Sequence, residues 1–259
     1  MVFSYYPGCT LKNKAKELDI KARLCAEKMG FTLDELTEWQ CCGGAYSSNK
    51  NEIGNKLPAV RALLQSAERG TDLVTLCSAC HNVIKRTCND IMTDNEFADK
   101  AERYLQTDLS AVRQGKVKVL HYLEVIRDIV GYDNLKNLVS NPLNDRKIAA
   151  YYGCLLLRPG KVMAMDDPEN PKIIEELIKA LGGETVIYPY RSECCGGYIS
   201  FEDKNQALKQ SRAIIGSAAG FGADSIVTAC PLCLYNLNKS GSEIPVMYFT
   251  EILAQALGV

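Results

Sequence analysis

The chain has 259 residues, a length that at roughly 150 residues per domain corresponds to one large domain or two smaller ones. Its 30 basic and 31 acidic side chains give a net charge of -1, which argues against a polybasic nucleic-acid-binding protein and an acidic tail protein. The unusual feature is the cysteine content, because the chain has twelve cysteines and only two histidines.

The beginning of the chain, Met1 to Gly8, lacks the charged region and the long apolar stretch of a signal peptide. No segment approaches the ~18 consecutive apolar residues of a membrane span. We therefore expect a cytoplasmic protein without a membrane span of its own. In such a protein, clustered cysteines more often bind metal or take part in redox chemistry than form structural disulfides.

Apolar periodicity predicts strands that alternate with helices along the chain. In chain order, we predict a strand over residues 2–6, helices over 19–29 and 57–68, a strand over 72–76, a strand over 147–152, helices over 171–181 and 205–219, and a strand over 224–228. Gly30 and Gly182 follow two of these helices, at positions where glycine commonly ends a helix. The alternation predicts an α/β fold in each half of the chain.

Ten of the twelve cysteines repeat across a polar, proline-containing segment at 140–145, which marks a domain boundary. We predict an N-terminal domain over residues 1–143 and a C-terminal domain over 144–259. The first set of cysteines is Cys9, Cys41, Cys42, Cys77 and Cys80, and the second set is Cys154, Cys194, Cys195, Cys230 and Cys233. In both sets, 34 residues lie between the adjacent pair and the C-x-x-C, whereas 31 residues in the first set and 39 in the second lie between the lone cysteine and the pair.

The residues around the cysteines repeat as well. Tyr6-Pro7-Gly8-Cys9 matches Tyr151-Tyr152-Gly153-Cys154, and both adjacent pairs continue as Cys-Cys-Gly-Gly. The segments 119–126 and 246–253 near the ends of the two halves also match. The long period indicates a tandem duplication of a domain and not a solenoid of short repeats.

The predicted strands bring the distant cysteines of each set together. Cys9, Cys77, Cys154 and Cys230 each follow a strand, and the carboxyl ends of parallel strands are where functional groups gather. Both C-x-x-C pairs are predicted to open a helix, with Pro231 in the first turn, and a helix N-terminus favours thiolate. The glycine pairs allow positive φ angles and can direct N–H groups at sulfur.

The five thiols of each set favour an iron–sulfur cluster over structural zinc, which prefers four ligands in short knuckles. A cubane cluster uses four thiolates, so either one cysteine per set is spare or the cluster has an unusual shape that needs five. The repetition of all five favours the unusual shape. A vicinal disulfide at Cys41–Cys42 and a thioredoxin-like dithiol at a C-x-x-C are the weaker alternatives.

Other side chains near the cysteines have ordinary and functional interpretations. Buried structural thiols are expected at Cys25 and Cys88, and a helix-face histidine without a ligand role at His81. Tyr46 and Tyr198 follow the glycine pairs, where core packing and a substrate role are both open. The cations that could attract an anionic substrate are Lys12, Lys14, Arg158, Lys161 and Arg191.

The chain contains one pattern twice: a lone cysteine, then Cys-Cys-Gly-Gly, then C-x-x-C. This pattern resembles that of the cysteine-rich CCG domain family. The two-domain length and Tyr5-Tyr6-Pro7-Gly8-Cys9 are similar to the B subunit of heterodisulfide reductases, and the resemblance extends from Val2 to about Leu257. It implies that each set of five cysteines binds a non-cubane [4Fe-4S] cluster. It further implies that the two clusters face each other across a disulfide, in the family the coenzyme M–coenzyme B heterodisulfide of methanogenesis, and reduce it with one electron each.

The resemblance also implies partners, because the chain contains neither a ferredoxin-type cysteine run nor a dinucleotide-binding glycine motif. In the family, electrons come from a ferredoxin-type iron–sulfur protein, the C subunit, with a flavin-containing A subunit beyond it. The sequence therefore predicts the catalytic subunit of a disulfide reductase complex. The alternatives are an electron-transfer subunit of a dehydrogenase complex that reduces quinone or another carrier, and a zinc-stabilised binding module without redox activity.

Overall fold

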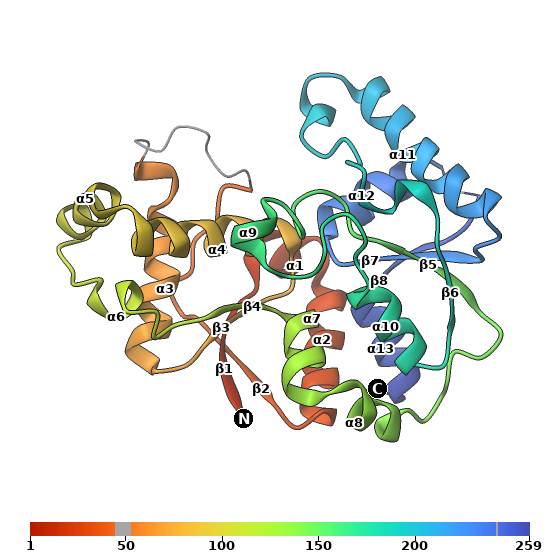
Figure 1. Ribbon diagram of the computed structural model, residues 1–259, viewed down its shortest axis with the longest axis horizontal. Helices are drawn as coiled ribbons and strands as arrows, with labels where there is room; N and C mark the ends of the chain where they lie inside the picture. The colour runs from red at the N-terminus through yellow and green to blue at the C-terminus, as the bar shows by residue number, and fades with distance from the viewer. Residues whose placement is uncertain (45–52, 242) are drawn as a thin grey trace.

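The computed structural model, which describes residues 1–44, 53–241 and 243–259, contains two parallel four-stranded sheets with the same strand order (Figure 1). The first sheet, ordered β2-β1-β3-β4, consists of β1 (Val2–Tyr6), β2 (Thr32–Glu35), β3 (Leu73–Thr75) and β4 (Val119–His121). The second, ordered β6-β5-β7-β8, consists of β5 (Lys147–Tyr151), β6 (Glu184–Val186), β7 (Ser225–Thr228) and β8 (Val246–Tyr248). The matching topology agrees with the predicted duplication.

Helices form the crossovers that parallel strands require. In the first half they are α1 (Gly8–Asn13), α2 (Lys16–Lys28), η1 (Ile53–Asn55), α3 (Leu57–Arg69), α4 (Ser78–Thr93), α5 (Asn95–Leu105), α6 (Ser110–Arg113), α7 (Tyr122–Glu124), η2 (Val125–Val130) and α8 (Tyr132–Leu138). In the second half they are α9 (Gly160–Met163), α10 (Ile173–Ala180), η3 (Pro189–Ser192), η4 (Ile199–Phe201), α11 (Lys204–Gly220), α12 (Pro231–Lys239) and α13 (Phe249–Leu257).

The predicted α/β fold is confirmed, and each predicted strand and helix has a counterpart within a few residues. Gly30 and Gly182 adopt φ angles of +84° and +87° just beyond the ends of α2 and α10, as expected for helix-ending glycines. The four edge strands, β2, β4, β6 and β8, were not predicted as strands. All are only three or four residues long, and β2 and β6 are also partly exposed, so they lack the longer apolar pattern of the central strands.

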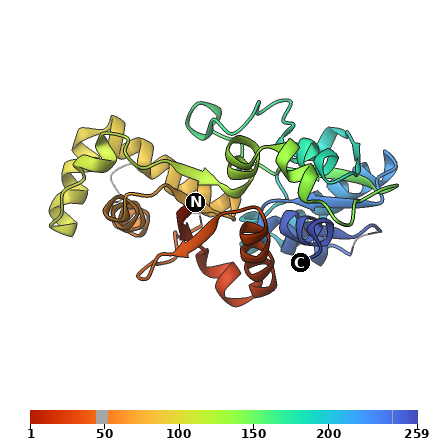
Figure 2. The same cartoon turned by 90° about the horizontal axis from the view of Figure 1, so that it is seen from below.

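The two halves pack against each other through a shared apolar core. Helix α2 lies beside α13 from the other half, as Figures 1 and 2 show. The Thr250 hydroxyl donates a hydrogen bond to the carbonyl of Leu18 at 3.2 Å, and Lys21 pairs with Glu251 at 3.6 Å. The predicted boundary at 143/144 falls in the connection between β4 and β5 and stays a prediction.

Among residues 1–44, 53–241 and 243–259, no helix combines the length and the apolar character that a membrane crossing requires.

Candidate functional site

The carboxyl ends of the sheets hold the cysteines, as predicted. Cys9 and Cys154 lie three residues beyond the ends of β1 and β5. Cys77 and Cys230 are the N-cap residues of α4 and α12, both with extended backbone, so each C-x-x-C opens a helix. Pro231 occupies the first turn of α12, where its missing N–H leaves no helical hydrogen bond unmade.

Within the first set, the sulfur atoms form close pairs. The Sγ atoms of Cys9 and Cys41 are 3.5 Å apart, and those of Cys42 and Cys80 are 3.4 Å apart. The Cys77 thiol is in hydrogen-bonding contact with Cys80. The five thiols that the sequence groups together therefore form two groups, Cys9 with Cys41, and Cys42 with Cys80 and Cys77.

The second set repeats this arrangement member by member. Cys195 and Cys233 have Sγ atoms 3.5 Å apart, Cys154 contacts Cys194, and Cys230 contacts Cys233. The lone cysteine therefore pairs with the first residue of the adjacent pair in both halves. The second residue of that pair contacts the last cysteine of the C-x-x-C.

The two sets meet at Cys77 and Cys230, whose thiols lie close enough across the interface between the halves for each to shift the pKa of the other. Two carbonyls just before these cysteines, those of Leu76 and Ala229, are held by side chains from both halves. The Tyr248 hydroxyl donates to Leu76 O at 2.5 Å and lies 3.4 Å from Ala229 O. The contact between the sets is thus fixed by the fold around it.

His121 is the counterpart of Tyr248 in the repeat and has a matching role. Its Nε2 lies 2.8 Å from the Leu76 carbonyl, and Ser78 Oγ donates to Ala229 O at 2.9 Å. His121 and Tyr248 both end a strand and both take part in a capping box with the glutamate three residues later. Sequence reasoning had identified the repeat at 119–126 and 246–253 but not this function.

Two further matched features hold the cysteine loops in place. The Tyr6 hydroxyl donates to the carbonyl of Gln40 at 2.5 Å, and the Tyr151 hydroxyl donates to that of Glu193 at 2.7 Å. Each carbonyl belongs to the residue just before an adjacent cysteine pair. The final tyrosines of β1 and β5 therefore anchor the start of both Cys-Cys-Gly-Gly segments.

The glycines of these segments behave as predicted. Gly43, Gly44 and Gly196 have φ angles of +82°, +74° and +78°, which side chains with a Cβ rarely adopt. The turn directs the N–H of Gly44 at Cys42 Sγ, with the nitrogen 3.4 Å from the sulfur. In the second half, the nitrogen of Gly196 is also 3.4 Å from a sulfur, Cys194 Sγ. Such N–H groups stabilise negative charge on sulfur.

The hydrogen bonds favour thiolate at one member of each adjacent pair. A hydrogen bond from Cys80, helped by the N–H of Gly44, lowers the pKa of the Cys42 thiol to about 7. A hydrogen bond from Cys154, with N–H groups of the glycine pair, lowers the pKa of Cys194 to about 6. Hydrogen bonds from Cys233 and Cys77 hold the pKa of Cys230 well below its usual range. Thiolate is the form that binds iron and zinc.

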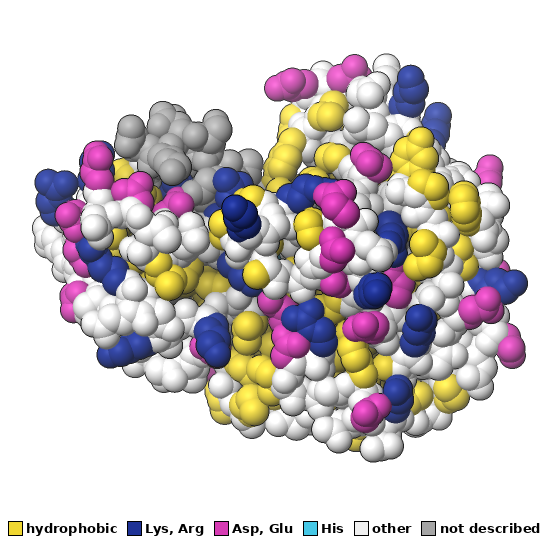
Figure 3. Space-filling model, in the orientation of Figure 1, with side chains coloured by type: hydrophobic (Ala, Val, Ile, Leu, Met, Phe, Trp, Pro, Cys, Tyr) yellow, Lys and Arg dark blue, Asp and Glu magenta, His cyan; other side chains and the backbone are white. Residues whose placement is uncertain are grey.

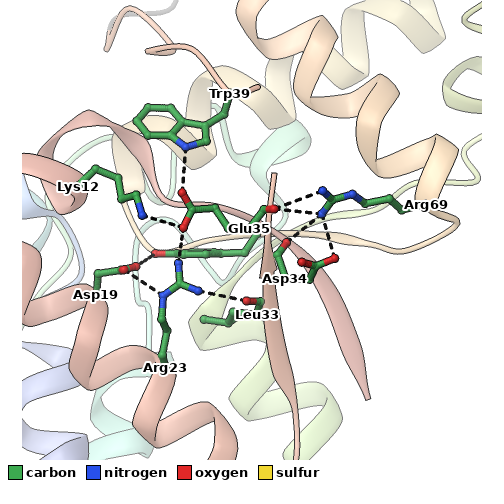
Figure 4. A network of polar contacts seen from close by, with 9 residues as sticks. Lys12, Asp19, Arg23, Leu33, Asp34, Glu35, Trp39 and Arg69 are labelled. Carbon is green, nitrogen blue, oxygen red and sulfur yellow. Dashed lines mark hydrogen bonds and ion pairs between the residues drawn. The ribbon is translucent and has the colours of Figure 1, made fainter. Parts of the chain in front are cut away.

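A network around Glu35 supports the loop that leads to Cys41 (Figure 4). The carboxylate accepts hydrogen bonds from Lys12 Nζ at 2.8 Å, Arg23 Nη2 at 2.7 Å and Trp39 Nε1 at 3.2 Å. Burial alone would raise the pKa of Glu35, but the Lys12 and Trp39 hydrogen bonds and the nearby cations lower it. Glu35 and Trp39 were missed because a lone acid and a lone indole carry no distinctive sequence signal.

Most of the predicted cations have other partners. Lys12 is bound to Glu35, and the buried Arg191 donates to Glu175 Oε1 at 2.6 Å. Arg158 pairs with Glu169 at 3.1 Å. Arg191 therefore supports the fold of the second half and is not positioned to attract a substrate. Lys14 and Lys161 lie on the exposed surface.

The remaining predicted residues have mostly structural environments. Cys25 and Cys88 are buried, and burial raises the pKa of their thiols to about 12 and about 11. His81 lies on helix α4, as predicted, and is fully buried, with Nδ1 3.3 Å from Thr75 Oγ1. Tyr46 lies outside the described residues.

Tyr198 has a different position, at the edge of the interface between the halves. Its hydroxyl donates to the carbonyl of Gly44 in the other half, and thiols of both sets lie close enough to affect its charge. Burial, with these thiols, raises the pKa of Tyr198, so the hydroxyl keeps its proton. Core packing is therefore the wrong interpretation for this residue, which is partly exposed beside both sets.

The donor chemistry fits a thiolate-bound cofactor. The ten grouped cysteines are free thiols, and a Cβ at Gly8 or Gly153 would lie only 2.9 or 3.2 Å from the Sγ of Cys80 or Cys233. The backbone thus approaches these sulfur atoms as closely as glycine allows. No group of three His, Cys, Asp or Glu side chains within the described ranges is arranged to hold a single metal ion. The paired cysteine sets are consistent with iron–sulfur binding.

Known proteins are similar in sequence to this chain over nearly its whole length. The 8-methylmenaquinol:fumarate reductase membrane anchor subunit of Wolinella succinogenes is 29% identical over 99% of this chain and 92% of its own length. The B subunit of the ferredoxin/F420H2-dependent CoB-CoM heterodisulfide reductase of Methanosarcina acetivorans is 27% identical over 98% and 89%. A protein of Archaeoglobus profundus, described as similar to the heterodisulfide reductase B subunit, is 28% identical over 99% and 90%.

The fold also matches a solved structure of a hypothetical protein from Helicobacter pylori, with a TM-score of 0.74 and 12% identity. The match covers 100% of this chain and 49% of that one, and it shows a shared fold alone. The family model described as "Cysteine-rich domain" (CCG) matches residues 3–85 and 148–238, one segment in each half. Because these segments make up more than half of the chain, the protein belongs to the CCG cysteine-rich domain family.

Proposed function

We propose that the protein is the catalytic subunit of a disulfide reductase complex and that each cysteine set binds one [4Fe-4S] cluster, of the non-cubane type. The observation that carries the proposal is that Cys77 and Cys230, one member of each set of five, lie close enough across the interface between the halves to shift each other's pKa. Cleavage of a disulfide consumes two electrons and two protons and yields two thiols. Two one-electron sites on either side of one interface match that requirement.

The assignment of residues follows the two sets. Cys9, Cys41, Cys42, Cys77 and Cys80 would hold one cluster, and Cys154, Cys194, Cys195, Cys230 and Cys233 the other. When bound, the clusters would supply the two electrons. The N–H groups of the glycine pairs would stabilise charge at the sulfur atoms, and the protonated Tyr198 hydroxyl would offer a hydrogen-bond donor at the edge of the interface. Tyr248 and His121 would maintain the separation of the two sites.

The relatives support a role in a larger complex. The Methanosarcina acetivorans relative is named as the B subunit of a CoB-CoM heterodisulfide reductase, and the Archaeoglobus profundus relative is named as similar to a heterodisulfide reductase B subunit. We infer that electrons reach this chain from two partners in the cytoplasm, a ferredoxin-type iron–sulfur protein and a flavin protein of the same complex. The coenzyme M–coenzyme B heterodisulfide or a related small disulfide is the proposed substrate.

Metal analysis with EPR spectroscopy on anaerobically prepared protein tests the cofactor. Two clusters correspond to about eight irons and about eight sulfides per chain. Cys195→Ser is expected to lose one cluster and disulfide turnover, whereas Cys88→Ser, which alters a buried cysteine outside both sets, should retain both. Zinc in place of iron would contradict the cofactor. Disulfide turnover by Cys195→Ser at the wild-type rate would contradict the two-site mechanism.

A second candidate function is electron transfer within a reductase or dehydrogenase complex that reacts with quinones. It is favoured by the 29% identity to a protein of an 8-methylmenaquinol:fumarate reductase. The two functions differ in what reoxidises the reduced protein. Rapid reoxidation by a quinone analogue, with no reaction with small disulfides, would favour this second candidate.

A further inference from the structure

A groove of about 300 Å³ lies on the second half, between η4, α11 and α12. Helix α11 contacts both η4 and α12, and the surface that lines the groove is mostly apolar. Its lining includes Phe201, Lys204, Leu232, Tyr235, Asn236 and Lys239. The groove takes no part in the contact between the two cysteine sets.

The wall of the groove is also the support of the second cysteine set. Asn236 directs its Nδ2 at Cys195 Sγ over 3.7 Å, and Ser211, also in the lining, donates to the Cys195 carbonyl at 3.0 Å. Leu232 lies between the two cysteines of the C-x-x-C and packs against Gly197. A Cβ added at Gly197 would lie 3.0 Å from the Leu232 side chain. One layer of side chains therefore separates the groove from the proposed ligands.

The rim of the groove exposes large apolar side chains that contribute little to the core. Phe201 is 82% exposed and Tyr235 57% exposed. Figure 3 shows apolar side chains along the edge of the upper lobe, which contains α11 and the turn before it (Figure 1). Exposed aromatic side chains around an apolar groove are typical of a surface that a partner covers, because aromatic anchors dominate interface energetics.

The charge around the groove indicates the kind of partner. Lys204 and Lys239 belong to its lining, and the Nζ of Lys239 lies 5.5 Å from the centre of the Tyr235 ring. Over segments 198–212 and 231–241 there are four cations and two acids, although the whole chain has a net charge of -1. A local excess of cations on a nearly neutral chain favours an acidic partner.

We propose that this groove is the docking surface of an acidic iron–sulfur electron carrier, which delivers electrons to the second cysteine set before the first. The inference rests on the proposed function, because only a redox site needs such a carrier. At each encounter the reduced carrier loses one electron and the site held by the second set gains it. Two encounters supply the two electrons of one disulfide.

The test uses the full-length protein with its clusters and a reduced acidic two-cluster ferredoxin as the probe. Binding is measured by calorimetry at low salt, and reduction by stopped flow with the ferredoxin or with a small viologen dye. The variants are Phe201→Ala and the double change Lys204→Glu/Lys239→Gln. Matched controls are Tyr104→Ala, which alters an exposed ring on α5 away from the groove, and Lys16→Glu/Lys28→Gln at the first and last residues of α2.

We expect both groove variants to weaken ferredoxin binding about tenfold and to slow reduction by ferredoxin, with unchanged reduction by the dye. The charge variant should also lose much of its dependence on salt. Ferredoxin binding that is absent in the wild type, or equal in groove and control variants, would overturn the docking site, as would a dimer that the groove variants dissociate. Normal docking without disulfide cleavage would instead contradict the proposed function.

Discussion

The hydroxyl of Tyr248 joins the two halves, and its removal tests this role. It is fully buried, and its hydroxyl donates to Leu76 O at 2.5 Å and lies 3.4 Å from Ala229 O. These carbonyls precede Cys77 and Cys230, the point of contact between the cysteine sets. Tyr248→Phe removes only the hydroxyl and keeps the ring and its packing against Phe249.

The magnitude follows from what remains after the hydroxyl is lost. A buried carbonyl left without a donor costs about 1–3 kcal/mol. Leu76 O keeps His121 Nε2 at 2.8 Å, and Ala229 O keeps Ser78 Oγ at 2.9 Å. The loss therefore belongs near the lower limit, about 1–1.5 kcal/mol in the free energy of unfolding. For a chain of this size, that change lowers Tm by about 2–6 °C.

Tyr122→Phe is the matched control, because its buried hydroxyl donates to Ala22 O at 2.8 Å within the first half. Both variants should lose a similar amount of stability by calorimetry. Hydrogen exchange should differ, since only Tyr248→Phe should speed exchange in peptides that cover 76–80 and 229–233. Unchanged exchange there, or the same change in the control, would show that Tyr248 does not join the two halves.

Three further predictions follow from the same contacts. Burial lowers the pKa of His121 from 6.5 to about 4. As the pH falls, the unfolded chain therefore binds a proton at this histidine before the folded chain does, and the free energy of unfolding should fall by about 3 kcal/mol between about pH 6.5 and pH 4. His121→Gln should show a smaller fall in Tm over this range. In metal-free protein, the hydrogen bond from Cys154 lowers the pKa of Cys194 to about 6. The rate at which iodoacetamide alkylates Cys194, mapped by mass spectrometry, should therefore be nearly independent of pH above about 7. A tenfold rise in this rate per pH unit would contradict the assignment. Gly8→Ala should destabilise by more than about 1 kcal/mol in urea unfolding, because Gly8 has φ +75° and its Cβ would lie 2.9 Å from a cysteine sulfur, whereas Gly216→Ala, with no neighbour within 4 Å, should stabilise slightly.

The repeated cysteines made the architecture of the candidate site predictable. Spacing alone grouped ten thiols into two sets, and the strands before Cys77 and Cys230 were visible as apolar runs. Because parallel strands end at a common edge, the convergence of distant cysteines followed from their positions just after predicted strands. The N-cap positions of both C-x-x-C pairs were predicted for the same reason.

The contacts between the halves could not be predicted, because they depend on how two domains are placed in space. His121 and Tyr248 are ordinary strand-end residues until the fold brings the carbonyls of Leu76 and Ala229 within their reach. Arg191 shows the opposite error. Its proximity to Cys194 in sequence suggested a role near the substrate, whereas its guanidinium is directed to the buried Glu175.

The two cysteine sets differ in exposure, and this difference predicts unequal reduction potentials. Cys9 and Cys41 are exposed, whereas Cys154 and Cys194 are only partly exposed. Reduction adds negative charge, and water stabilises that charge better than a buried environment does, so the site of the first set should have the higher potential. An electron that enters at the groove beside the second set would then move downhill to the first set, and the next electron would complete the pair.

An EPR-monitored redox titration should resolve two one-electron steps. The step at the higher potential should shift in variants of Tyr6, whose hydroxyl lies among the first set of thiols, and should not shift in Tyr151→Phe. A single step for both sites, or a higher step that responds to Tyr151→Phe alone, would contradict this order of potentials.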